Sequence, residues 1–293
     1  MFKSYIATQR DLFAIEEALR YVWDSKLDFV FQDKTVIRST IVVSFDSKFV
    51  YLWSLRKFSN LSPIPCTLEE YNAYKIPHRL LIAKEFHYGW HAGITPEIER
   101  LLPDTIKNSS RFSVPLISGG LVTPFITLQK SFRKKNNPYT TRKSYLATIV
   151  HEFGHVYWNQ YKLWWYSNKE ENLRYLKTAM KFYSNKKSTA SVTQINLPVN
   201  QGIGEAYAFC TEYFASSLFW PTHKKMLDEF VQQILFWTIE SESKINLETE
   251  DSTLEPSLHP HLYAFVISNI ILARYPKTWP LILTATHFLQ SNH

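Results

Sequence analysis

Residues 151–155 read His151-Glu152-Phe153-Gly154-His155, and this pentapeptide decides the chemistry and the fold that we expect. On an α-helix, side chains four residues apart lie on one face, one turn from each other, so both imidazoles can reach a single ion. Glu152 is rotated by about 100° from His151, which directs its carboxylate toward a water on that ion. This is the HExxH arrangement, which predicts two zinc ligands and a general base.

The sequence around the pentapeptide predicts the helix that this arrangement requires. Residues 142–161 carry apolar side chains at helical spacing on most sides of the helix, which predicts that it is buried. Thr140 or Thr141 is placed to cap its N-terminus. Gly154 costs about 1 kcal/mol of helix stability relative to alanine, and a close approach of another backbone would explain it.

A catalytic zinc site needs a third protein ligand and an open fourth position. Glu205 and Glu212 lie seven residues apart in a predicted helix over residues 203–219, so they share a face that is otherwise apolar. Carboxylates in apolar surroundings are costly unless they are paired. We interpret Glu205 as the third ligand and Glu212 as the residue that accepts from the N–H of a zinc-binding histidine, behind the ligands. The swapped assignment of the two glutamates stays open.

Together, the two segments resemble the gluzincin metallopeptidases, in which an HExxH helix is followed by a helix whose glutamate completes the zinc site. The segments that carry the resemblance are His151-Glu152-Phe153-Gly154-His155 and Gly204-Glu205-Ala206-Tyr207-Ala208. The pentapeptide is also similar to that of the lethal-factor-type toxin proteases. The resemblance covers residues 142–219, and Ala206 replaces the glycine of the aminopeptidase pattern. It implies Zn²⁺ on His151, His155 and Glu205, with Glu152 as the base.

The expected reaction is the hydrolysis of a peptide bond by a zinc-activated water. Glu152 would take a proton from that water and later deliver it to the leaving amine. The oxyanion of the tetrahedral intermediate needs one further donor, and the resemblance implies a Tyr or His from a later helix. His261 and Tyr263 are our candidates. The alternative for each is a structural role, as a histidine at the start of a helix and a tyrosine in the core.

The hydrophobic patterns predict an α+β protein with most strands in its first part. We expect an N-terminal mixed α/β accessory region with a small sheet over residues 1–115, and a mostly helical, zincin-like catalytic domain over residues 116–293. Residues 121–128, interrupted by Pro124, are the candidate edge strand that pairs with an extended substrate. The predicted strands are residues 35–45, 49–55 and 79–86; the predicted helices are one opening at Thr8 and residues 142–161, 169–184, 203–219, 222–242, 261–274 and 281–290.

Composition narrows the partners and the compartment. With 33 basic and 26 acidic residues, the chain carries a formal net charge of +7. A basic cluster over residues 130–143 contains few aromatic side chains for stacking, which argues against nucleic acid as a partner. The partner that we expect is a peptide or protein substrate. We find no signal peptide and no apolar run long enough to span a membrane, so we expect a cytoplasmic protein, with leaderless export left open.

The sequence is also compatible with two other functions. One is a regulatory or interaction protein that keeps a metallopeptidase-like fold without catalysis. The presence of Glu152 argues against it, because a structural metal site has no use for a base at that position. The other is a secreted or injected toxin protease, which differs from the first hypothesis in its location and its target.

Overall fold

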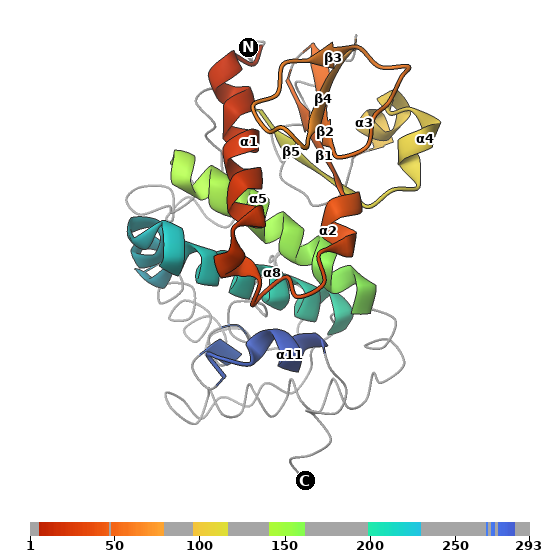
Figure 1. Cartoon of the computed structure of the whole chain (residues 1–293). Coiled ribbons are helices and arrows are strands. Elements are labelled where there is room, and N and C mark those ends of the chain that lie inside the picture. The colour runs from red at the N-terminus through yellow and green to blue at the C-terminus, as the bar shows by residue number, and fades with distance from the viewer. Residues whose placement is uncertain are drawn as a thin grey trace, which may run out of the picture. The chain divides into compact units, whose positions relative to one another are not determined.

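The computed structural model describes residues 6–46, 48–78, 96–116, 141–161, 199–229, 268, 271–272 and 275–284. By its internal contacts the chain divides into two compact units, Met1–Tyr157 and Trp158–His293. Figure 1 labels the elements of both. The predicted domain boundary after residue 115 stays a prediction.

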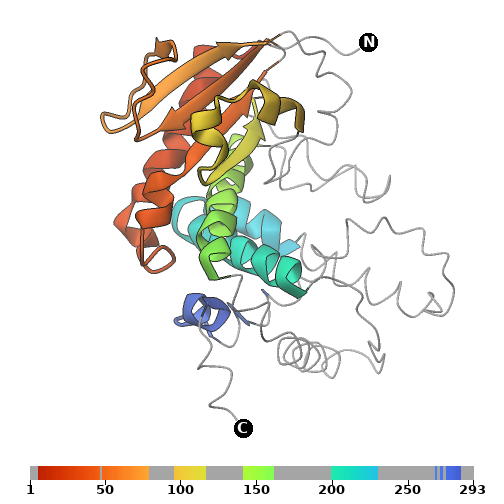
Figure 2. The same cartoon turned by 90° about the vertical axis from the view of Figure 1, so that its right-hand side faces the viewer.

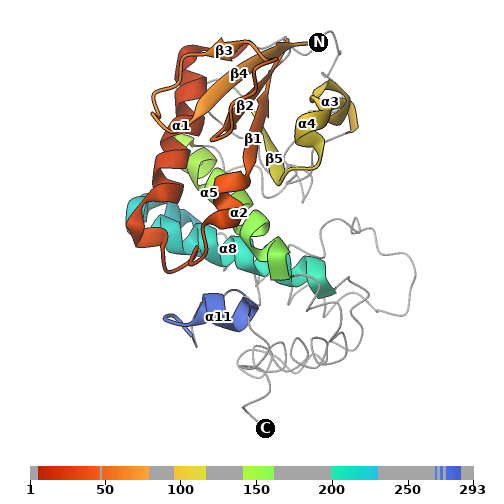
Figure 3. The same ribbon diagram turned by 45° about the vertical axis from the view of Figure 1, so that its right-hand side comes forward.

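The first unit contains a five-stranded sheet with the strand order β3-β4-β2-β1-β5 (Figure 3). Neighbouring strands pair antiparallel except β1 and β5, which pair in parallel, with Val42 opposite Phe112. Ser44 supports this parallel pair because its hydroxyl donates to the carbonyl of Val114 at 2.6 Å. The strands are β1 (Ile41–Phe45), β2 (Phe49–Ser54), β3 (Pro63–Ile64), β4 (Asn72–Pro77) and β5 (Arg111–Pro115).

Successive side chains of each strand point to opposite faces of the sheet. Helices cover both of these faces. Val43 and Phe45 lie in a buried apolar cluster with Ile98, Leu102 and Ile106, which come from the segment that contains α3 (Pro96–Leu101) and α4 (Asp104–Lys107). On the opposite face, Phe112 of β5 packs on Phe153 of α5 (Arg142–Trp158), and α1 (Gln9–Trp23) lies on the same side (Figure 2). Figure 2 shows α3 and α4 in yellow in front of the sheet, with α1 in red behind it.

The N-terminal helix α1 begins where the sequence predicts. The backbone N–H and the hydroxyl of Thr8 both donate to Asp11 Oδ2, at 2.8 and 2.7 Å. This places an acidic side chain at the positive end of the helix dipole. At the other end of α1, the indole N–H of Trp23 donates to the hydroxyl of Tyr71 at 2.9 Å, which connects the helix to the segment before β4.

Helix α5 spans Arg142–Trp158 and continues as a short 3₁₀ helix, Asn159–Tyr161, so the predicted helix over residues 142–161 is confirmed. Thr141 is its cap: the Ser144 N–H donates to Thr141 Oγ1 at 3.2 Å, and the Thr141 N–H donates to Ser144 Oγ at 2.9 Å. These reciprocal bonds satisfy backbone donors that a helix start otherwise leaves without partners.

In the second unit, the described residues are mostly helical. Helix α8 spans Val199–Phe219, and residues 221–229 form a further helix. Pro221 explains the break, since it lacks an N–H to continue α8 but suits the first position of a new helix. Helix α11 spans Trp279–Thr284, and Trp279 packs on Tyr207 of α8 with ring centroids 5.2 Å apart. No helix among the described residues is long and apolar enough to cross a membrane.

The structure therefore has the predicted mixed character, a small sheet followed by a helical part. One predicted strand is wrong in its first half: Thr35–Ser39 form the short helix α2, and the strand begins at Ile41. A 3₁₀ turn, Ser25–Leu27, and the strands β3, β4 and β5 were not predicted. The predicted strand over residues 79–86, the predicted edge strand over residues 121–128 and the predicted helix over residues 169–184 lie outside the described residues.

Candidate metal centre

The two faces of α5 carry different side chains, aromatic packing residues on one and the two histidines on the other. Phe153 packs edge-to-face on Phe112 of β5 at 5.0 Å between ring centroids, and Tyr157 packs on Phe31 at 5.6 Å. At 100° per residue, His151 and His155 lie on the opposite side of the helix from these two rings. The contacts of these rings with Phe112 of β5 and with Phe31 thus fix the rotation of α5, and this rotation determines where the two imidazoles point.

The two histidines lie next to each other as the spacing predicts. Their ring centroids are 4.9 Å apart and their planes are inclined by 72°. His151 is buried, whereas His155 is half-buried. One side of the pair is therefore in contact with solvent, which a ligand pair needs if a substrate is to reach the ion.

Glu205 completes a group of three potential metal ligands. One ligand atom each from His151, His155 and Glu205 lies within 4.8 Å of the other two. Zinc bonds of about 2.1 Å place neighbouring ligand atoms roughly 3.4 Å apart in a tetrahedron, so small side-chain rotations are enough to close the group on an ion. Two imidazoles and one carboxylate also match the donor set of catalytic zinc sites, which leaves the fourth position for solvent.

The structure groups Glu205, and not Glu212, with the two histidines. Glu205 is half-buried and directly follows Gly204 in α8. Of the two assignments that the sequence leaves open, this geometry favours the first, with Glu205 as the third ligand.

Glu152, the expected base, is 3 % exposed. A carboxylate in such surroundings is costly to keep charged unless a donor or a cation lies near it. Its place directly after His151 puts it at the side of the ligand group rather than inside it. That position suits a group that exchanges protons with a water and does not bind the ion.

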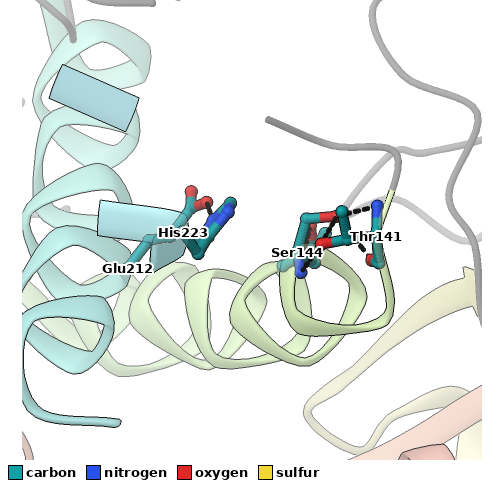
Figure 4. Close-up of polar contacts among 5 residues, drawn as sticks. Thr141, Ser144, Glu212 and His223 are labelled. Atoms are coloured by element: carbon teal, nitrogen blue, oxygen red, sulfur yellow. Dashed lines mark hydrogen bonds and ion pairs between the residues drawn. The ribbon is translucent and has the colours of Figure 1, made fainter. Parts of the chain in front are cut away.

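Glu212 has a partner that the sequence did not reveal. His223 Nε2 lies 3.2 Å from Glu212 Oε1, and both side chains are only 1 % exposed. Figure 4 shows the two side chains pointing toward each other, together with the Thr141–Ser144 contacts at the start of α5. A glutamate on an apolar helix face predicts a buried partner, but nothing in the spacing singles out His223. The predicted contact of Glu212 with a zinc-binding histidine stays a prediction.

Two further predicted site residues, His261 and Tyr263, lie outside the described residues. The cysteines belong to the described part and are both free thiols. Cys210 is fully buried in α8, and burial raises the pKa of its thiol to about 12. It is a core thiol, as its position in an apolar helix predicts, and such a pKa excludes a thiolate nucleophile at neutral pH.

No protein-family model, no curated protein and no solved structure matches the chain.

Proposed function

We propose that this protein is a zinc-dependent peptidase in which His151, His155 and Glu205 hold the ion and Glu152 is the general base. The observation that carries the proposal is the group of three ligand atoms within 4.8 Å of one another, with an acidic residue directly after the first histidine. This donor set suits zinc best among the common metal ions. The choice of peptide bonds as the substrate comes from the resemblance to gluzincins.

Each residue has a separate task in the proposed reaction. Bound zinc supplies a Lewis acid that polarises the scissile carbonyl and brings the pKa of a bound water toward about 7. Glu152 accepts the proton of the attacking water and returns it to the amine that leaves. His151 and His155, held by α5, orient the ion, while Glu205 adds the negative charge that offsets part of the charge of the ion. His261 and Tyr263 are the proposed donors to the developing oxyanion.

Metal content is the first test of this proposal. Protein purified without a chelator is expected to hold close to one zinc ion per chain by elemental analysis. Glu205→Gln, which removes a ligand charge at nearly constant volume, is expected to lose that zinc. Glu212→Gln makes the same change on the same helix and is expected to keep the zinc fully or in part.

A wild-type chain that holds no zinc even after zinc is added back would sink the proposal. Loss of zinc in Glu212→Gln together with retention in Glu205→Gln would exchange the roles of the two glutamates. Screening against a peptide library then tests the reaction itself.

A further inference from the structure

Within the second unit, Trp158, the last residue of α5, lies in tight contact with Gly204 of α8. A Cβ atom built on Gly204 would lie 3.1 Å from Trp158 Cε3 and 3.2 Å from Cζ3. Comfortable contacts between carbon atoms are roughly 3.5–4.0 Å, so the indole ring lies against the helix backbone itself. Only glycine lets the ring approach α8 this closely.

This contact lies beside two of the proposed ligands. His155 precedes Trp158 by three residues, so both side chains lie on the same face of α5, one turn apart. Glu205 directly follows Gly204. Both proposed ligands therefore lie close to this contact along the chain, His155 one turn before Trp158 and Glu205 one residue after Gly204.

The indole ring is also held from its other edge. Trp158 is 3 % exposed, and its Nε1–H donates to the carbonyl oxygen of Leu283 in α11 at 3.1 Å. In the same helix, Trp279 packs on Tyr207 of α8. A ring that is fixed by a hydrogen bond at one edge and by a helix backbone on its face cannot change its tilt without breaking one of the two contacts.

We propose that Trp158 is a positioning residue of the metal centre: its ring, seated on Gly204 and anchored to α11, fixes the separation of His155 and Glu205. The inference rests on the proposed metal centre. Side chains that orient a metal ligand without touching the metal or the substrate typically change metal affinity by about 10- to 100-fold when they are altered.

A double-mutant cycle on the full chain tests this role through metal affinity. The variants are Gly204→Ala, Trp158→Leu and the double variant, and the zinc dissociation constant is measured by competition with a chelating dye. In the wild-type background the added methyl group pushes the ring away, and we expect zinc affinity to fall by about tenfold or more. In the Trp158→Leu background the same methyl group no longer meets the indole ring, and we expect it to leave zinc affinity unchanged or to improve it.

The visible absorption spectrum of the Co²⁺-loaded protein supplies a second reading, because its bands follow the ligand geometry rather than the stability of the fold. We expect the spectrum of Gly204→Ala to differ from that of the wild type, and the double variant to resemble Trp158→Leu. The matched control is Trp53→Leu, an equal loss of a buried tryptophan from strand β2 of the first unit. It is expected to lower the melting temperature of the zinc-free protein while keeping zinc affinity within about threefold of the wild type.

The outcomes separate this inference from the proposed function. Equal zinc affinity in the wild type and in folded Gly204→Ala overturns the positioning role alone, as does an equal loss in both backgrounds. If Gly204→Ala does not fold, the comparison of Trp158→Leu with Trp53→Leu decides: similar zinc affinities overturn the inference. A wild type that binds no zinc overturns both proposals, whereas tight zinc binding without peptidase activity overturns only the reaction.

Discussion

At the scale of single residues, burial distinguishes the acidic side chains of the candidate site. Glu152 and Glu212 are 3 % and 1 % exposed, whereas Glu205, in the ligand group, is half-buried. A buried carboxylate persists only where donors or cations compensate its lost hydration. His223 supplies such a partner for Glu212. The proposed metal centre assigns proton exchange to Glu152 and a metal ion to Glu205.

Glu152→Gln separates the proposed chemistry from the binding of zinc. Glutamine has nearly the same shape but accepts no proton, so we expect zinc content to stay at the wild-type level and peptide cleavage to fall by about 10²- to 10⁴-fold. Cleavage is measured by mass spectrometry on a peptide library, and zinc by elemental analysis of the same samples. Full biological activity in this variant would favour the non-catalytic alternative.

The buried pair of Glu212 and His223 makes a separate prediction about stability. His223→Ala leaves a buried carboxylate without this partner, and we expect the free energy of unfolding to fall by about 3 kcal/mol. His223→Gln retains a side-chain donor and is expected to lose less. Urea denaturation of the zinc-free protein measures both, and an unchanged midpoint in His223→Ala would show that the pair contributes nothing to folding.

At the scale of elements, α5 carries packing side chains on one face and the proposed metal ligands on the other. One face carries Phe153 and Tyr157, which pack on Phe112 of β5 and on Phe31. The opposite face carries the two histidines. A helix that is buried on both sides gains little from amphipathicity, so its N-terminal cap and its packing must hold it in place.

Thr141→Val tests whether the N-terminal cap of α5 affects only the stability of the fold or also the metal centre. Valine has the shape of threonine but lacks the oxygen that accepts from the Ser144 N–H. We expect a loss of about 1 kcal/mol in the free energy of unfolding, measured by thermal denaturation, and no change in zinc stoichiometry, because His151 lies more than two turns further along. Thr141→Ser keeps the cap and serves as the control. A loss of zinc in Thr141→Val would mean that the start of α5 and the metal centre are coupled.

At the scale of the whole molecule, each unit contains one free cysteine, which makes the opening of each unit measurable. Cys66 in the first unit is half-buried, and Cys210 in the second is fully buried. Burial raises the pKa of both thiols, that of Cys210 to about 12. Because the thiolate is the reactive form, a raised pKa lowers the reactive fraction at pH 8, and the labelling rate must increase as the pH rises.

We therefore expect iodoacetamide to label Cys66 slowly in the folded protein, at a rate that rises steeply above pH 8. Cys210 should react only after the second unit opens. Zinc should slow the labelling of Cys210, because a ligand that binds only the folded form reduces the population of open forms. Mass spectrometry of the two cysteine-containing peptides follows both rates. Rapid labelling of Cys210 at pH 8 without denaturant would contradict its place in the core.

The sequence by itself determined the local features whose cause is local. The start of α1 at Thr8 and Asp11, the extent of α5 and the helix that contains Glu205 follow from capping residues and from apolar spacing. The adjacency of His151 and His155 follows from the pitch of a helix alone. Local patterns were insufficient for Thr35–Ser39, where β-branched residues form a helix, since such preferences are weak against tertiary packing.

Only the tertiary structure decided the contacts between segments that are distant along the chain. It grouped Glu205 with the two histidines, paired Glu212 with His223 and seated Trp158 on Gly204. Spacing left the two glutamates equivalent, because residues seven apart share a helix face whatever lies opposite that face. The strand order of the sheet is likewise a result of packing. Periodicity reports which face of an element is buried, but the partner that buries it is chosen by the complete chain.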